Sequence, residues 1–527
     1  MNMIPPVEQS APIPFLMDAI ESGPATANGV LEGLGAWTVQ RAALSLIPEV
    51  FARDNRVLPL VIRDGELLIA CPDPADGGLL QTVEMLTRHE VRAVQFSEAE
   101  ILRAIADRYS DMVGVEREVQ AFTRLAARGD SRSAQTVAAS ETGPVVQVVD
   151  KIISLGLRSR ASDIHLEPQR SGLRVRFRID GLLNDAMLLP QEIAAPIASR
   201  IKVMANLDIV DRHRSQDGQI QIDVQGRHVD IRVSTAETIA GEKVVLRLLD
   251  QARTILRLDN LGLSDDNVRT FGRLLRWPFG MVVVSGPTGS GKTTTLYAAI
   301  NELDASSQNI TTIEDPVEYT FENINQIQIR KVANLNFANG LRSILRQDPD
   351  VILVGEIRDL ETAEIAVQSA LTGHLVLTSL HATDAAAVVQ RFIEMGIEGY
   401  LLSSALIGVV AQRLVRRICP QCRAPYELTP EEAALWTELA ASPKTMFYRG
   451  VGCEHCAGTG YHGRVGVFEV LPLSDEVKRA VSVKAPAEVI RAKAVRDGMV
   501  LLRQDAVRKV EADLTTLSEV IRCVWVS

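Results

Sequence analysis

The sequence predicts an α/β protein with a phosphate-binding loop at the centre of a parallel sheet. Three observations support this fold class. A glycine-rich stretch, 286–294, lies between an apolar run, 281–284, and a segment of helical character, 294–303. A second apolar run, 351–354, ends just before the acidic residue Glu356. Apolar runs without alternation are typical of strands that are buried on both faces of a parallel sheet.

The glycine-rich stretch has the pattern G-x-x-x-x-G-K-T of a phosphate-binding loop. Glycines let backbone N–H groups turn toward a polyphosphate, and the following helix adds partial positive charge at its N-terminus. The Lys292 ammonium is expected to reach the β- and γ-phosphates, and the Thr293 hydroxyl to bind Mg²⁺. An ordinary turn between a strand and a helix, the alternative, would not need the lysine. The predicted nucleotide-binding residues are Gly286, Pro287, Thr288, Gly289, Ser290, Gly291, Lys292, Thr293 and Thr294.

Acidic residues that follow two predicted strands are candidates for catalysis. Glu356 follows the run 351–354, at the end of a strand where ligands bind in α/β sheets. It is expected to orient the attacking water or to hold Mg²⁺ through a water. Glu314 and Glu318 follow the short predicted strand 309–313 and could polarise water or contact the metal. A solvated charged loop is the alternative for these two carboxylates.

Two histidines flank a further predicted strand within residues 372–383. His374 and His381 are seven positions apart. A regular strand would therefore point them to opposite faces, which argues against a metal site made of both histidines. Either one could sense the γ-phosphate or hydrogen-bond to another subunit, and a structural role is equally open.

Four of the six cysteines form two C-x-x-C pairs about 30 residues apart, which predicts a zinc site. Each pair places two thiolates on one turn, within reach of a tetrahedral ion. Four sulfur ligands complete the coordination of Zn²⁺, so the predicted role is structural. The segment 423–452 is expected to form a small module held by the metal. The predicted ligands are Cys419, Cys422, Cys453 and Cys456.

Length and charge limit the classes of function. The chain has 527 residues, which is too long for a single core, and a net charge of −10. This charge disfavours non-specific binding of nucleic acid, although a local basic patch at Arg413, Arg416 and Arg417 stays open. No apolar run approaches the ~18 residues of a membrane span, and residues 1–20 lack a signal-peptide pattern. The expected location is the cytoplasm, with any membrane association made through a partner.

In their order along the chain, these segments resemble the secretion ATPase superfamily of type II secretion systems and type IV pili. Members of that family have a Walker A loop, an Asp box (here 312–318), a Walker B motif (345–356) and a His box (372–383). The resemblance extends from about residue 144 to the C-terminus. It implies a RecA-like P-loop NTPase core that binds ATP, Mg²⁺ and Zn²⁺ and forms a homohexameric ring. Assembly ATPases of the family carry a similar tetracysteine element, which favours assembly or secretion over pilus retraction.

The resemblance also implies roles for arginines in a preceding PAS-like α+β domain. Arg232 and Arg247 match candidates for stabilising the charge that develops on the γ-phosphate. Closure of their domain would then complete the site. Without the resemblance, outward arginines on alternating strands are more simply explained as solvated. Further family positions, expected to serve subunit contacts, are Arg342, Arg346, Arg358 and Arg464.

The predicted domain organisation follows from these segments and from changes in composition. Strands at 58–62 and 67–70 and a helix at 98–109 indicate a small N-terminal α+β domain. The predicted units are a flexible N-terminus (1–35), a partner-docking domain (36–125), a linker (126–143), the PAS-like domain (144–255) and the ATPase domain (256–527). The last contains the zinc-binding module (415–460) and a C-terminal helical part (461–527).

The predicted function is an ATP-hydrolysing motor that powers pseudopilus assembly and type II secretion at the inner membrane. Its first domain would dock on the cytoplasmic part of an inner-membrane protein, and acidic phospholipid is a further candidate contact. A type IV pilus assembly ATPase is the alternative, which is disfavoured because the region before 144 has room for only one N-terminal domain. A nucleic-acid motor and a non-hydrolysing nucleotide-binding scaffold are more distant alternatives for the function. The negative charge argues against the first, and the intact Lys292, Glu314 and Glu356 against the second.

Overall fold

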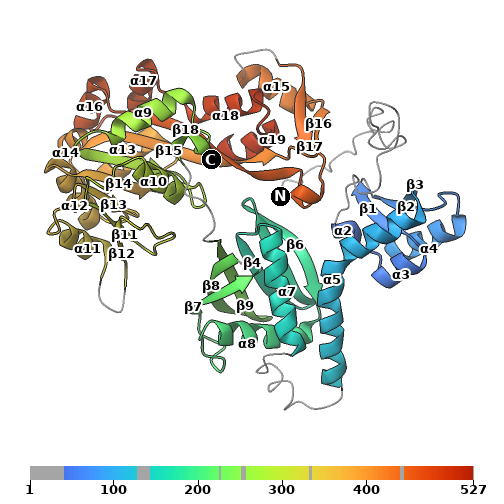
Figure 1. Cartoon of the computed structure of the whole chain (residues 1–527). Helices are drawn as coiled ribbons and strands as arrows, with labels where there is room; N and C mark the ends of the chain where they lie inside the picture. Colours follow the sequence, from blue (N-terminus) through green and yellow to red (C-terminus); the bar gives the residue numbers. More distant parts are fainter. Residues whose placement is uncertain are drawn as a thin grey trace, which may run out of the picture.

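A computed structural model describes the chain in three folded units (Figure 1). The predicted N-terminal segment 1–35 lies outside the described residues, as does the predicted linker 126–143 except at its two ends. The described residues are 41–44, 46–63, 65–127, 143–224, 227–250, 257–330, 335–439 and 444–525.

The first unit is a three-stranded sheet with short helices. Strand β1 pairs antiparallel with β2, as the two predicted strands and the turn between them require, and β2 pairs parallel with β3. The elements are α2 (Arg41–Leu44), α3 (Glu49–Asp54), β1 (Leu58–Arg63), β2 (Glu66–Cys71), α4 (Gly77–Thr87), β3 (Glu90–Gln95) and α5 (Glu98–Ala127).

Helix α5 takes part in two hydrophobic cores. It is longer than the predicted helix 98–109, and its second half packs on helix α7 (Pro144–Arg158). An ion pair of 3.3 Å between Lys151 and Glu118 joins the two helices. One continuous helix therefore links the first unit to the second. Its core residues are Ile101 and Ile105 in the first unit, and Val115, Val119 and Phe122 in the second.

The second unit is an antiparallel sheet of six strands in the order β6-β5-β4-β9-β8-β7. Strand β5 alternates between buried and partly exposed positions, so its arginines share the face away from the core. The strands are β4 (Asp163–Gln169), β5 (Gly172–Ile179), β6 (Leu182–Leu189), β7 (Gln216–Val224), β8 (Arg227–Thr238) and β9 (Gly241–Asp250). The helices after α7 are η3 (Gln191–Ile193) and α8 (Ala194–Met204).

The third unit is built on a seven-stranded sheet in the order β12-β11-β13-β14-β10-β15-β18. Its pairings are parallel apart from that of β18, which runs antiparallel to β15. The predicted strands at 281–284 and 351–354 are confirmed, and both are buried throughout. The strands are β10 (Gly280–Ser285), β11 (Ile310–Glu314), β12 (Asn325–Gln328), β13 (Val351–Val354), β14 (Leu375–Leu380), β15 (Leu406–Ile418) and β18 (Tyr461–Pro472).

Helices cover this sheet on both faces. Those before Cys419 are η4 (Leu258–Leu261), α9 (Asp265–Leu275), α10 (Lys292–Asn301), α11 (Phe337–Ile344), α12 (Leu360–Leu371), α13 (Ala385–Glu394) and α14 (Gly399–Ala405). The segment that carries the predicted zinc ligands, 419–460, is here called the zinc-binding segment. It contains β16 (Arg423–Tyr426), α15 (Pro430–Leu439), β17 (Phe447–Gly450) and η6 (Glu454–Cys456). The last helices are α16 (Asp475–Ser482), α17 (Ala487–Arg496), α18 (Leu502–Glu511), α19 (Leu517–Val520) and η7 (Ile521–Trp525).

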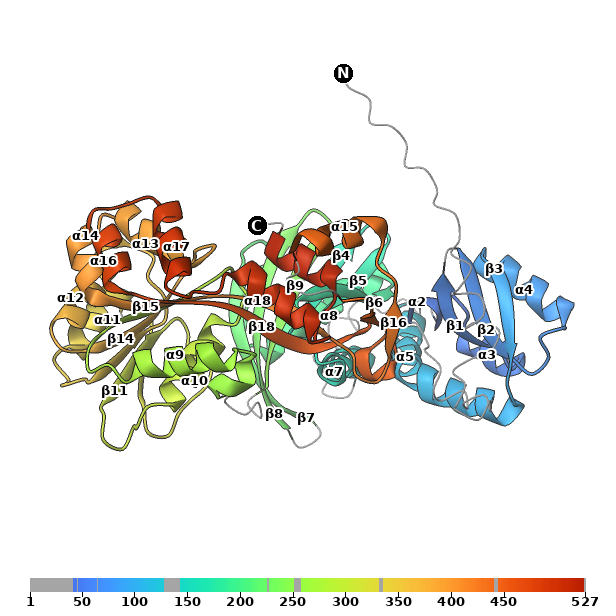
Figure 2. The ribbon, with the colours of Figure 1, turned by 90° about the horizontal axis from the view of Figure 1, so that it is seen from above.

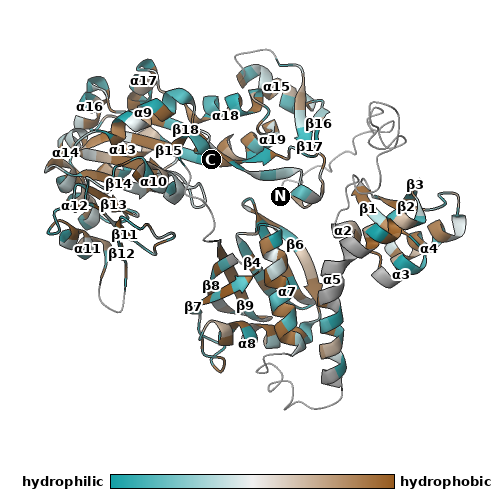
Figure 3. Cartoon of the chain, viewed as in Figure 1, coloured by the Kyte–Doolittle hydropathy of each residue, from teal (hydrophilic) through white to brown (hydrophobic). Residues whose placement is uncertain are grey.

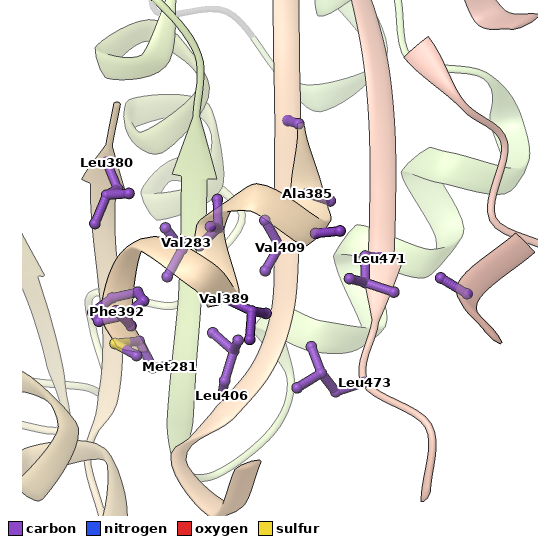
Figure 4. Packing of buried hydrophobic residues seen from close by; sticks show 14 of the residues in the cluster. Met281, Val283, Leu380, Ala385, Val389, Phe392, Leu406, Val409, Leu471 and Leu473 are labelled. Carbon is purple, nitrogen blue, oxygen red and sulfur yellow. The ribbon is translucent and has the colours of Figure 1, made fainter. Parts of the chain in front are cut away.

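Alternate residues of the central strands fill two separate cores. Met281 and Val283 of β10 face the core that includes α13, whereas Val282 and Val284 face the opposite core. Figure 4 shows Phe392 and other apolar side chains of α13 and the strands packed together on the first of these faces. In Figure 3 the hydrophobic colour follows the strands of the sheets. Burial on both faces explains why these strands have no polar alternation.

The prediction of a helical part from 461 onward is wrong at its start. Strand β18 pairs with β15 from Tyr461, opposite Ile418, to Pro472, opposite Gly408. The buried stretch 466–471 lies at one edge of the sheet, and the helices begin only at Asp475. Figure 2 shows β15 and β18 as a long ribbon that leads from the sheet toward the zinc-binding segment.

Among the helices that the structure describes, none combines the length and the apolar character that crossing a bilayer requires.

Candidate nucleotide-binding site

The phosphate loop connects β10 to α10 and requires its glycines. Gly286, Gly289 and Gly291 have φ angles of +151°, +77° and +87°, in the range that residues with a Cβ rarely adopt. A Cβ on Gly286 would also lie 2.5 Å from the backbone oxygen of Gln412 and 2.5 Å from Ser290 Oγ. The sequence motif and the backbone therefore agree at Gly286 and Gly291, and the backbone adds a need for glycine at 289.

The ammonium group of Lys292 lies along this loop at the start of α10. It donates hydrogen bonds to the backbone oxygens of Gly286, at 2.9 Å, and Pro287, at 3.1 Å. Burial lowers the pKa of Lys292, the Glu356 carboxylate opposes that shift, and the Arg413 guanidinium adds to it. A polyphosphate beside Lys292 would favour its charged form.

The loop also has a support that the motif does not contain. Gln412 of β15 is buried and donates from Nε2 to the backbone oxygen of Ser290 at 2.7 Å. This residue was missed by the sequence prediction. A glutamine directly after the apolar stretch 406–411 is the signal that could have identified it, because buried amides need partners.

Glu356 and His381 meet at the ends of neighbouring strands, β13 and β14. His381 Nε2 lies 3.8 Å from Glu356 Oε2, and Arg358 Nη2 forms an ion pair of 2.5 Å with Glu356 Oε1. Burial lowers the pKa of His381, the charge of Lys292 lowers it further, Glu356 opposes this, and Arg358 adds to it. A neutral imidazole, a carboxylate and the loop lysine thus share one region. Arg358, which was expected to contact another subunit, pairs with Glu356 within this chain.

His374 occupies the other end of β14. Its Nδ1 lies 2.9 Å from the backbone oxygen of Ser369, near the end of α12. Because β14 spans only Leu375–Leu380, both histidines of the His box lie just outside the strand. His374 precedes the strand and His381 follows it, so the two histidines lie at its opposite ends. The expectation that they lie on its opposite faces does not apply.

Glu314 is the most enclosed of the candidate carboxylates. It is 3% exposed and accepts hydrogen bonds from Tyr297 Oη at 2.5 Å, Thr312 Oγ1 at 2.7 Å and Gln326 Nε2 at 3.3 Å. These bonds satisfy both of its oxygens. Glu318 is partly exposed, and its carboxylate faces Arg232 of the second unit.

The two candidate arginines lie opposite each other on β8 and β9 but have different partners. Arg232 reaches the Asp box, where its Nη1 lies 3.3 Å from Glu318 Oε1 and its Nη2 donates to the backbone oxygen of Val317 at 3.1 Å. Arg247 stays within its own unit, where its Nε donates to Asp163 Oδ1 at 3.1 Å. Of the two, Arg232 is the one that touches the third unit.

The local basic patch that the sequence left open at 413–417 is not formed. Arg413 is buried and donates to the backbone oxygens of Gln412 and Thr383. Arg416 forms an ion pair of 2.8 Å with the buried Glu519 and stacks over the ring of Tyr461. Only Arg417 of the three is exposed. The inward partners explain the difference, since a guanidinium with a buried carboxylate or carbonyl is not a surface charge.

The four cysteines of the two C-x-x-C pairs come together as predicted. Their sulfur atoms all lie within 4.8 Å of one another, and three of the separations are 3.7, 3.8 and 3.7 Å. A Zn–S distance of about 2.3 Å places the sulfurs of a tetrahedral site about 3.8 Å apart. A disulfide would need about 2.05 Å. The spacing therefore fits a zinc ion.

Backbone N–H groups point at these sulfurs. The amides of Cys453 and Gly460 lie 3.1 and 3.2 Å from Cys456 Sγ, and the amide of Gly452 lies 3.3 Å from Cys422 Sγ. Burial raises the pKa of Cys422 and Cys453. At Cys456 burial acts in the same direction, but the hydrogen bonds from the Cys453 and Gly460 amides outweigh it and the pKa is lowered. Such bonds favour the thiolate form that binds a metal.

Comparisons with known proteins identify the family of this chain. The family model described as type II/IV secretion system protein matches residues 138–522, and a model described as MshEN domain matches residues 31–115. The chain belongs to the type II/IV secretion system protein family. It is an ATPase of that family.

Several relatives match this secretion ATPase over most of its length. The type IV pilus assembly ATPase PilB of Myxococcus xanthus is 41% identical over 92% of this chain and 87% of its own. The type II secretion system protein E of Aeromonas hydrophila is 41% identical over 91% of this chain and 97% of its own. The solved ATPase DotB of Legionella pneumophila shares the fold, with a TM-score of 0.53 and 22% identity over 70% of this chain and 93% of its own.

Proposed function

We propose that this ATPase is the motor of a type II secretion system and acts at the cytoplasmic side of the inner membrane. The observation that carries the proposal is the contact of Arg232 with the Asp box. An arginine from a separate unit at the border of the nucleotide site gives hydrolysis a means to move that unit. The relatives named type II secretion system protein support the assignment of the system.

The residues of the loop would bind and orient ATP. Backbone amides of the loop and Lys292 would hold the phosphates, and the Thr293 hydroxyl would hold Mg²⁺, which neutralises phosphate charge when bound. Glu356 would orient the attacking water, and the neutral imidazole of His381 would hydrogen-bond near it. Glu314 and Glu318 would keep the Asp box in place around the site.

The second unit would complete the site by closing. Arg232, already at the border, and Arg247, which is 60% exposed on its side chain, would both be brought toward the γ-phosphate. A guanidinium at that position stabilises charge that develops during transfer. Closure would require Arg247 to leave Asp163, whereas Arg232 would keep its contact with the Asp box.

The zinc-binding segment would have a structural role. A closed site of four thiolates leaves no coordination position for a substrate. Zn²⁺ there would hold the segment 423–452 to the ends of β15 and β18.

The assembly would be a homohexameric ring that docks through its first unit. The match of residues 31–115 to a separate domain family supports a distinct task for that unit, which we assign to docking on the cytoplasmic domain of an inner-membrane secretion protein. Acidic phospholipid is a second candidate contact. The 41% identity to a pilus assembly ATPase keeps pilus assembly as the second function.

Steady-state phosphate release by the wild type and by Glu356→Gln tests this function. Each protein is assayed alone, with acidic phospholipid vesicles, with DNA or RNA, and with the cytoplasmic domain of a type II or a pilus membrane partner. Turnover that rises with the type II partner and is lost in Glu356→Gln is the expected result. Stimulation by the pilus partner alone would move the chain to pilus assembly, and stimulation by nucleic acid alone would overturn both assignments.

A further inference from the structure

A buried tyrosine on the helix after the phosphate loop has no role in the mechanism above. Tyr297 lies in the second turn of α10 and is 3% exposed. Its hydroxyl donates to Glu314 Oε2 at 2.5 Å and accepts the backbone N–H of Glu318 at 3.2 Å. Its ring packs edge-on against the rings of Tyr319 and Phe321. Both its hydroxyl and its ring therefore contact one segment, 314–321.

Glu314 is fixed as the acceptor of this hydroxyl. Burial raises the pKa of Tyr297, and the hydrogen bond to Glu314 and the charge of Glu314 raise it further, so the hydroxyl keeps its proton. Thr312 and Gln326 also donate to the Glu314 carboxylate. Gln326 in addition donates to the backbone oxygen of Tyr319 at 2.9 Å. The segment is thus held from β11, from β12 and from α10.

The same segment carries the contact with the second unit. Val317 and Glu318 accept the hydrogen bonds of Arg232 through a backbone oxygen and a carboxylate oxygen. Gln328, an exposed residue of β12, supports Val317 by accepting its backbone N–H at 3.3 Å. An unbroken path of hydrogen bonds therefore runs from Tyr297, through Glu318, to Arg232.

We infer that Tyr297 is a positioning residue that ties Arg232 of the second unit to the phosphate-loop helix. Helix α10 begins at Lys292, so any displacement of the loop at the phosphates is carried along the helix to Tyr297. The hydroxyl does not touch the substrate, but it fixes the segment that receives Arg232. The inference rests on the proposed function, in which closure of the second unit completes the site.

Removal of the hydroxyl alone is the direct test. Tyr297→Phe keeps the ring contacts and takes away one hydrogen bond to Glu314 and one from Glu318. We expect kcat to fall about tenfold and the KM for ATP to change less than about twofold, because the phosphate loop is untouched. Tyr400→Phe, at an exposed position of α14, is the matched control and should keep the wild-type kcat.

A double-variant cycle separates positioning from a merely structural role. In an Arg232→Gln background, Tyr297→Phe should have no further effect on kcat, because the segment no longer has an arginine to hold. Gln328→Ala removes the acceptor of the Val317 backbone N–H at an exposed position, where folding is not at stake. It should lower kcat in smaller measure, and only while Arg232 is present.

The outcomes are distinct. Effects of Tyr297→Phe and Arg232→Gln that multiply would overturn the inference, as would a lower melting temperature of Tyr297→Phe with an unchanged kcat. If Tyr297→Phe does not fold, Gln328→Ala decides, and an unchanged kcat there is again against the inference. A wild-type protein that shows no turnover even with its membrane partner would instead overturn the proposed function.

Discussion

The nucleotide site and the zinc-binding segment are built in opposite ways. The four thiols come from two short turns at the ends of one pair of strands, and backbone amides of the same turns face the sulfurs. The nucleotide site draws on β10, β11, β13, β14 and β15 and, through Arg232, on a second folded unit. A site made from neighbouring residues can be rigid, whereas one divided between two units can open and close. The contrast predicts that damage to the first is a loss of stability and damage to the second a loss of turnover.

The largest effect is expected at the loop lysine. Lys292→Ala should lower ATP turnover about 100-fold or more, because it removes the charge that holds the phosphates. Phosphate release and nucleotide binding measure this. Lys484→Ala, which breaks only the exposed pair with Glu398, is the control. Normal turnover by Lys292→Ala would mean that the loop is not the site.

A zinc ligand should show the opposite behaviour. Cys419→Ser should abolish the binding of about one zinc per chain and lower the melting temperature. The reason is that the free energy of metal binding at such a site stabilises the folded state. ATP binding should persist, since no ligand cysteine contacts the loop. Metal analysis and thermal unfolding are the measurements, with Cys71→Ala as the control that keeps its zinc. A protein that is equally stable without zinc would show that the ion has no structural role.

The strand that leads to the zinc ligands depends on a buried carboxylate. Arg522 and Arg416 donate to Glu519, and although burial acts to raise its pKa, these bonds bring the pKa from 4.5 to about 2. A depressed pKa stabilises the fold above pH 4.5 and loses that contribution as the pH falls toward about 2. Glu519→Gln should therefore unfold more easily at neutral pH, by at most roughly 3 kcal/mol. The difference from wild type should shrink across that pH window, and a constant difference would contradict the origin in charge.

The smallest effect is expected at the histidine away from the nucleotide. His374→Ala loses the contact with Ser369 and should cost about 1 kcal/mol of stability with no change in turnover. His381→Ala, beside Glu356, should lower turnover with little change in stability. Thermal unfolding and phosphate release on the two variants, side by side, measure this. Equal effects on turnover would remove the distinction between the two ends of β14.

Contiguous motifs account for what the sequence predicted well. The strands 281–284 and 351–354 and the gathering of the four cysteines are confirmed, because each is specified by neighbouring residues. The family relationship is confirmed by the match over residues 138–522. The assignments of individual catalytic roles stay predictions.

What the sequence missed depends on contacts between distant segments. Tyr297 lies in an apolar helical pattern, where it is indistinguishable from a core residue until Glu314 is placed beside it. Arg416 reads as surface charge until Glu519, far along the chain, is brought to it. The start of the C-terminal part was misjudged because the pairing of β18 with β15 is decided by the open edge of the sheet, which local propensity does not encode.

Helix α5 contributes to the cores of two units, so the chain cannot be divided cleanly between the regions of the two family matches. The two family matches end at residue 115 and begin again at 138, which invites a cut between them. A chain shortened to start at 138 would lose Val115, Val119 and Phe122 and leave the apolar face of α7 bare to water. Such a fragment should aggregate, while one that begins at Asp111 keeps these three residues, leaves out Ile101 and Ile105 of the first core, and should stay monodisperse. The helix that follows the first sheet thus supplies part of the hydrophobic core of the second unit.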